Sequence, residues 1–69
     1  MPSEKLFHID AKWTHTGGVR GWKHYRIVTL RGEGTERELE LMAICDRSVR
    51  FWVKELEFRN DPQWNPGWL

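Results

Sequence analysis

The sequence predicts an all-β fold, built as a small antiparallel meander. Residues 22–31 and 49–53 are rich in the aromatic and β-branched side chains that strands prefer. Along residues 37–45 every second residue from Leu39 to Cys45 is apolar, as in a strand with one buried face. Glycines and Asp46 stand between these segments, where antiparallel strands need turns.

Residues 1–69 form a single small tryptophan-rich β domain in this interpretation, because a chain of 69 residues has room for one core. Cys45 is the single cysteine, which excludes an intrachain disulfide, and its apolar neighbours predict a buried thiol in a reducing cytosol. Five tryptophans, three phenylalanines and one tyrosine are expected to stabilise the fold instead. Each such ring buries on the order of 150–250 Å².

Charge and spacing narrow the classes of function. The formal net charge is +1, from 11 basic and 10 acidic side chains, and a dedicated nucleic-acid binder usually has a larger basic excess. The three histidines and Cys45 lack the spacing of zinc ligands, so we expect no metal and no other cofactor. No apolar segment approaches the ~20 residues that span a membrane, and no signal peptide is evident, which predicts a soluble, cytoplasmic protein.

The N-terminal third is expected to be loosely organised. Residues 1–11 form a lead-in whose apolar side chains, Leu6, Phe7 and Ile9, are available for docking. Residues 12–16 are expected to form a short strand or an extended segment. The glycine-rich residues 16–21 lack the Lys-Ser/Thr ending and the following helix of a phosphate-binding loop, so we interpret them as a flexible connection.

A central hairpin is predicted from alternation. In residues 37–45, Leu39, Leu41, Ala43 and Cys45 share one face, and Glu38, Glu40, Met42 and Ile44 share the other. Helix is the competing interpretation, since Glu, Leu, Met and Ala favour helices, but the next segment also alternates. A three-residue loop, 46–48, matches faces and charges in a register that pairs Ala43 with Phe51, Leu41 with Val53, Ile44 with Arg50, Met42 with Trp52 and Glu40 with Lys54.

The C-terminal segment is predicted to close the fold. Residues 55–58 leave the sheet, Asp61 caps a single helical turn that begins at Pro62, and residues 65–67 end that turn. The apolar end of the chain is expected to fold back onto the sheet. Because an open meander leaves one face uncovered, we expect it to curl into an SH3- or Tudor-like barrel; a flatter meander covered by the tail is the alternative.

The candidate binding surface is the sheet face opposite Val49, Phe51 and Val53. Its predicted members are basic and aromatic: Trp22, Lys23, Arg26, Arg47, Arg50, Trp52 and Lys54. Such side chains either stack on bases or act as hot spots of protein interfaces. The alternative is that Trp64, Trp68 and Leu69 cover this face as a second core layer. Trp13, Trp64 and Trp68 are expected to fasten the ends of the chain, and Trp22 and Trp52 to face a partner.

No catalytic residue is predicted, because no nucleophile has a base at a recognisable spacing. We therefore expect a non-enzymatic interaction module whose partner is a protein. The alternative is an RNA-binding small β-barrel, ranked second because Glu36, Glu38 and Glu40 lie near the proposed face. A purely structural subunit of a larger complex is a third hypothesis.

Several motifs carry a resemblance that spans residues 12–68. They are Lys12-Trp13-Thr14, Lys23-His24-Tyr25, Glu38-Leu39-Glu40-Leu41-Met42-Ala43, Trp52 with Glu55-Leu56, and Trp64-Asn65-Pro66-Gly67-Trp68. Together they resemble a family of small tryptophan-rich bacterial proteins of unknown function. The Trp-x-Pro-Gly-Trp ending is the most specific element. The resemblance implies a bacterial, cytosolic, single-domain protein, and it transfers no site.

Overall fold

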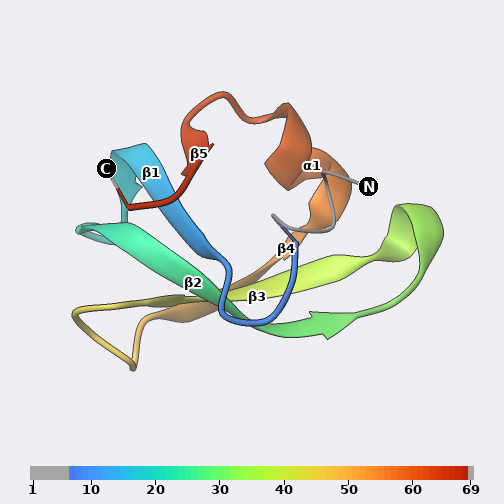
Figure 1. Cartoon of the computed structure of the whole chain (residues 1–69), viewed down its shortest axis with the longest axis horizontal. Coiled ribbons are helices and arrows are strands. Elements are labelled where there is room, and N and C mark those ends of the chain that lie inside the picture. The colour runs from blue at the N-terminus through green and yellow to red at the C-terminus, as the bar shows by residue number, and fades with distance from the viewer. Residues whose placement is uncertain (1–6, 69) are drawn as a thin grey trace.

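The computed structural model describes residues 7–68, which fold into one curled sheet with a short helix beside it (Figure 1). The elements in chain order are β1 (Lys12–Val19), β2 (Trp22–Arg31), a 3-10 turn (Gly34–Glu36), β3 (Glu38–Ala43), β4 (Arg50–Lys54), α1 (Glu55–Asn60) and β5 (Trp64–Pro66). The mainly-β prediction is confirmed.

All neighbouring strands run antiparallel, in the order β4-β3-β2-β1-β5. Strands β1 to β4 therefore form the predicted meander, and β5 returns to the free edge of β1. Figure 1 shows α1 and β5 on the same side of the β2–β3 ribbon. Within residues 7–68, no hydrogen-bonded pairing joins the edge strands β4 and β5. The sheet is open, and the predicted barrel is not confirmed.

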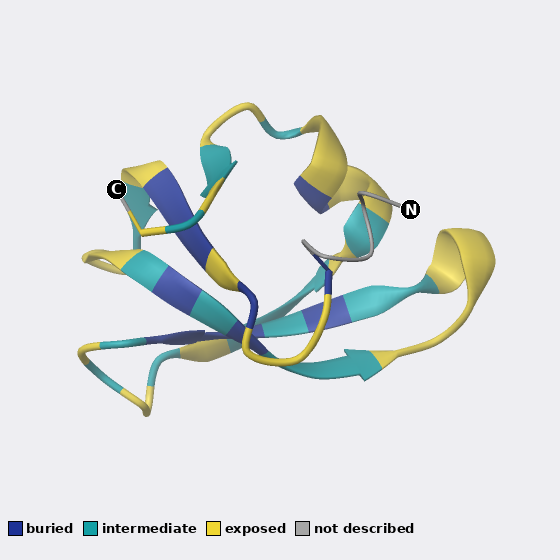
Figure 2. Ribbon diagram, viewed as in Figure 1, coloured by how far each residue is buried: buried dark blue, intermediate teal, exposed yellow. Residues whose placement is uncertain are grey.

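The core lies on the concave side of the sheet, and Figure 2 shows buried positions along its central strands. Tyr25 and Ile27 from β2 and Leu39, Leu41 and Ala43 from β3 are fully buried, at the alternating positions that a strand directs to one face. Aromatic rings from Phe7, Trp13 and Phe58 complete the cluster. Phe7 thus docks as predicted, whereas Ile9 is exposed and Leu6 lies outside the described residues.

The glycine-rich segment is ordered strand and turn, so its interpretation as a flexible connection was wrong. β1 continues to Val19, which pairs with Trp22, and a bulge between Thr14 and Val19 takes up the glycines. Arg20 and Gly21 both have positive φ, at 51° and 87°. Two-residue turns with positive φ at both positions match the twist of antiparallel strands, which explains the tight connection.

The register between β3 and β4 differs from the prediction by two residues. Leu41 pairs with Phe51, Leu39 with Val53 and Glu38 with Lys54. Since strand faces repeat every two residues, the slip leaves each side chain on its predicted face. Residues 44–49 connect β3 to β4, so the loop is longer than predicted. Within it the Asp46 carboxylate accepts hydrogen bonds from Ser48 N (3.0 Å) and Ser48 Oγ (2.6 Å).

Cys45 lies in this loop and is exposed, so the prediction of a buried thiol was wrong. The strand that was expected to extend through Cys45 ends at Ala43, whose N–H donates to the Val49 carbonyl at 3.0 Å. The thiol is thereby carried past the last hydrogen-bonded pair of the hairpin and away from the core.

The helix precedes the position that the sequence predicted. α1 follows β4 directly, because residues 55–60 include good helix formers and an ion pair between Arg59 and Glu55 one turn apart. Asp61 is the C-cap residue, so its predicted role as N-cap was wrong. Its Oδ1 instead accepts a hydrogen bond from Gln63 N at 2.9 Å, which turns the chain into β5.

The tail folds back onto the sheet, as predicted, but as an edge strand. Trp64 pairs with His15 and Pro66 with Trp13. Beyond β5, the Thr14 hydroxyl donates to the Gly67 carbonyl at 2.7 Å, and Trp68 Nε1 donates to the Tyr25 carbonyl at 3.0 Å. Leu69 lies outside the described residues.

Candidate functional site

The convex face of the sheet, here called the outer face, carries most of the predicted site. Register and alternation place on it Lys12 and Thr14 from β1, His24, Arg26, Thr29 and Arg31 from β2, Glu38, Glu40 and Met42 from β3, and Arg50, Trp52 and Lys54 from β4. Most of the side chains on this face are basic or acidic, and two of them, Met42 and Trp52, are large and apolar.

A basic row crosses four strands of the outer face. Lys12 pairs with Arg26, Arg26 with Met42, and Met42 with Arg50. Met42 is only 3% exposed although it lies on this face. The register sets an arginine on either side of it, and the aliphatic stems of long basic side chains cover apolar surface while their charges stay in water. Arg26 is ion-paired with Asp10, and Arg50 Nε donates to the Arg47 carbonyl at 3.3 Å.

Trp52 lies beside this row and is half-buried. The guanidinium of Arg31 stands 3.7 Å from the centroid of its ring, a close cation–π contact. The same Arg31 donates from Nε to Glu38 at 2.8 Å, so the carboxylate holds the guanidinium in place. Glu40, opposite Trp52, accepts a hydrogen bond from the Thr29 hydroxyl at 2.8 Å. Trp52 is therefore part of a preorganised surface.

Arg31 is a member of the site that sequence reasoning missed. Strict alternation from Ile27 would direct Arg31 to the core side, but a bulge between Ile27 and Thr29 inserts one extra residue into β2. After the bulge Leu30 points inward and Arg31 outward. The apolar Leu30 out of phase with Tyr25 and Ile27 was the signal that could have revealed it.

The tail covers only part of the outer face. Trp68 is 44% exposed, and Lys12 Nζ lies 5.0 Å from the centroid of its ring, at the β1 end. Thr14 beneath this segment is buried. Trp64, by contrast, packs on the core side, edge-on to Tyr25 at 5.5 Å and stacked on Phe58 at 4.8 Å. The tail therefore covers the outer face where Trp68 lies on β1. The contact described for Trp52 is with Arg31 and not with the tail.

The seven predicted residues are only partly brought together. Arg26, Arg50, Trp52 and Lys54 share the outer face, and alternation along β2 adds Trp22 at its far end. Alternation along β2 places Lys23 on the opposite face from these residues. Arg47 is exposed in the loop 44–49, where its carbonyl accepts a hydrogen bond from Arg50 Nε.

The described part of the chain lacks two other kinds of feature, a metal-binding cluster and a membrane-spanning helix. Between residues 7 and 68, no three histidine, cysteine or carboxylate side chains lie close enough to hold a metal ion. In the same range, α1 is far too short to cross a bilayer, and no other helix is long and apolar enough.

Comparison with known proteins identifies the family. Residues 11–69 match the family model described as Tryptophan-rich protein (DUF2389). The match covers most of the chain, so the protein belongs to this tryptophan-rich family of unknown function, as the motifs predicted. Comparison with curated proteins gave no match, and comparison with solved structures gave none.

Proposed function

We propose that this member of the tryptophan-rich family is a non-enzymatic interaction module that binds a protein through its outer face. The observation that carries the proposal is the Arg31–Trp52 pair, held in place by Glu38 and flanked by Arg50. Tryptophan and arginine dominate the hot spots of protein interfaces because they combine large contact area with directional hydrogen bonds. A half-buried ring that is already fixed loses little entropy on binding.

The charges of the outer face support a protein partner. Arg26 and Arg31 are paired with carboxylates of this chain, whereas Arg50 and Lys54 are exposed. A mixed surface of this kind complements a partner that presents a few carboxylates at fixed positions. The same Glu38 and Glu40 repel the continuous phosphates of a nucleic acid.

RNA binding is the alternative, favoured by one observation. Lys12, Arg26 and Arg50 stand in a row across the sheet, next to a ring on which a base can stack. The discriminating measurement is binding to mixed RNA at increasing salt concentration. Phosphate contacts release counterions, so RNA binding weakens steeply with salt, and absence of binding at low salt would exclude this alternative.

Affinity capture from the native cell extract tests the main proposal, with nuclease-treated and untreated samples compared. Trp52→Ala is expected to abolish capture of the partner while costing less than about 2 kcal/mol of stability, because the ring is half-buried. Leu56→Ala, on exposed α1, is the matched control and should capture normally. Undiminished capture by Trp52→Ala, or loss of capture after nuclease treatment, would overturn the proposal.

A further inference from the structure

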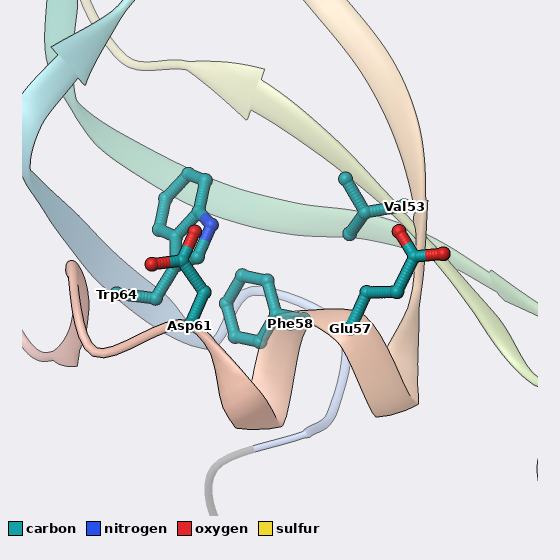
Figure 3. Close-up of a pocket in the computed structure, with 5 residues that line it drawn as sticks. All are labelled: Val53, Glu57, Phe58, Asp61 and Trp64. Carbon is teal, nitrogen blue, oxygen red and sulfur yellow. The ribbon is translucent and has the colours of Figure 1, made fainter.

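A small pocket opens on the other side of the molecule, between α1 and the two edge strands of the sheet (Figure 3). Its lining comes from Val53 of β4, Glu57 and Phe58 of α1, Asp61, and Trp64 of β5. Figure 3 shows the ring of Phe58 between the two carboxylate side chains, with the indole of Trp64 next to Asp61. Apolar groups thus form one part of the pocket and acidic groups another.

The size of the pocket limits its occupant. Its volume is about 110 Å³. Pockets for nucleotides, cofactors and drug-sized ligands measure roughly 300–1,000 Å³, and a cavity of about 150 Å³ accommodates benzene. The pocket therefore fits the end of one side chain and is too small for a nucleotide base with its sugar.

The aromatic part of the lining is suited to a cation. Phe58 and Trp64 stack on each other with their centroids 4.8 Å apart, so each ring covers one face of the other. Phe58 is buried and Trp64 is half-buried, which makes the indole the more accessible aromatic ring of the pocket. The faces of aromatic rings carry negative electrostatic potential and attract ammonium and guanidinium groups. Arginine has this preference elsewhere in the chain, where Arg59 lies over Phe7 at 4.1 Å and Arg20 over Phe51 at 5.2 Å.

The carboxylates of the pocket differ from their neighbour Glu55. Glu55 is ion-paired with Arg37 and Arg59, each at 3.1 Å. For Glu57 and Asp61, by contrast, the described residues supply no lysine or arginine nitrogen within 4.0 Å. Among the described residues, Glu57 and Asp61 thus stand beside the aromatic part of the pocket without a lysine or arginine partner.

His15 contacts two residues of the pocket, Trp64 and Asp61, without lining the pocket itself. Its side chain is 10% exposed, its ring meets Trp64 edge-on at 4.8 Å, and its Nε2 is 4.0 Å from Asp61 Oδ2. Its Nδ1 has no hydrogen-bond partner among the residues that the structure describes.

We propose that the pocket binds the guanidinium group of an arginine side chain presented by a protein partner. The planar guanidinium packs against the indole of Trp64 and donates its N–H groups to Glu57 and Asp61, an arrangement that the compact ammonium of lysine matches less well. This site is separate from the outer face and does not depend on the function proposed there.

A titration with N-acetyl-L-arginine methylamide tests the proposal. The nitrogen–proton correlation spectrum of the intact protein resolves the indole N–H of each of the five tryptophans. The arginine probe is expected to shift the Trp64 signal saturably at millimolar concentrations, and the corresponding citrulline derivative, neutral and nearly isosteric, should not. The lysine derivative should bind more weakly than the arginine probe.

Two variants locate the effect. Glu57→Gln and Asp61→Asn should each weaken arginine binding about three- to fivefold, the size expected for one exposed charge pair. In the second variant the amide oxygen of the introduced side chain can still accept the hydrogen bond from Gln63 N, so the turn is kept. Glu33→Gln, at an exposed residue before the 3-10 turn, is the matched control and should leave the affinity unchanged.

Three results would overturn the proposal: an equal response to citrulline, an unmoved Trp64 signal, or unchanged affinity in both pocket variants. Equal binding of the lysine probe would overturn the choice of arginine. Trp52→Ala separates the two sites, because it should abolish partner capture and leave the Trp64 response intact.

Discussion

Phe58 is the only side chain of α1 that is buried, at 3% exposure, and its replacement tests how the open side of the sheet is sealed. Its ring packs edge-on to Trp13 at 4.6 Å and stacks on Trp64 at 4.8 Å. A helix as short as Glu55–Asn60 is not stable alone in water, so α1 depends on this packing. Phe58→Ala removes the ring and leaves a cavity between β1, β5 and α1.

Phe58→Ala is expected to lower the free energy of unfolding by about 3–5 kcal/mol, the usual cost of truncating a buried phenylalanine. A domain of 69 residues has a total stability of roughly 3–10 kcal/mol, so the substitution removes much or all of it. Each kcal/mol moves the midpoint of thermal unfolding by about 4–8 °C in a domain of this size, which predicts a fall of more than about 12 °C.

Urea unfolding followed by tryptophan fluorescence and far-ultraviolet circular dichroism measures the loss. Leu56→Ala is the control on the same helix, since Leu56 is 47% exposed and should cost less than about 1 kcal/mol. If Phe58→Ala costs no more than Leu56→Ala, α1 does not seal the core and the packing argument fails.

Two further predictions concern a turn and the titration of Tyr25. Gly32→Ala should lower the free energy of unfolding in urea by about 2–3 kcal/mol, because φ is +81° and the new Cβ would lie 2.6 Å from the Glu36 carbonyl oxygen. Gly34→Ala, at φ +55° with open space around it, should lower it by about 1–2 kcal/mol. Equal losses in the two variants would contradict the role of the Glu36 contact. Burial raises the pKa of Tyr25, although the charge of Arg20 lowers it in part, so stability should be complete below the unfolded-state value of about 10 and fall as the pH rises through it. Measured as urea midpoints in alkaline buffers, the stability of Tyr25→Phe should fall less with rising pH than that of the unaltered protein. An equal fall in the two proteins would exclude Tyr25 as the titrating group.

Local patterns were sufficient for the central strands. β2 begins and ends at the predicted residues, and the faces of β3 and β4 are as predicted, because alternation is a property of each strand alone. The position of α1 was not predicted, because it depends on contacts with distant residues and not on a local pattern. Residues 55–60 are too few to give a helical period, and their helix is fixed by the distant rings that Phe58 contacts.

The register error has a similar cause. The predicted pairing set Glu40 opposite Lys54, and the observed pairing sets Glu38 there. Both place an acid opposite a base and keep apolar side chains on one face, so the hairpin sequence does not distinguish them. The longer loop is decided by the Asp46–Ser48 hydrogen bonds, together with the pairing of β3 with β2 on its other side.

Much of the outer face could be predicted from the sequence and the pocket could not, because the pocket is assembled from separate elements. Arg50, Trp52 and Lys54 lie on one strand, and alternation was enough to group them. The pocket draws Val53, Phe58 and Trp64 from three elements that meet only after β5 has paired with β1, so no spacing in the chain marks it.

The bulge in β2 links the core to the proposed binding surface. It turns Leu30 inward, where it packs against the core, and by the same extra residue turns Arg31 outward. Arg31 is then able to stack on Trp52 and pair with Glu38. Without the bulge, the core side would receive a charge and the outer face would lose the cation that fixes its tryptophan. A single irregularity of the backbone therefore satisfies the packing of one face and sets Arg31 against Trp52 and Glu38 on the other.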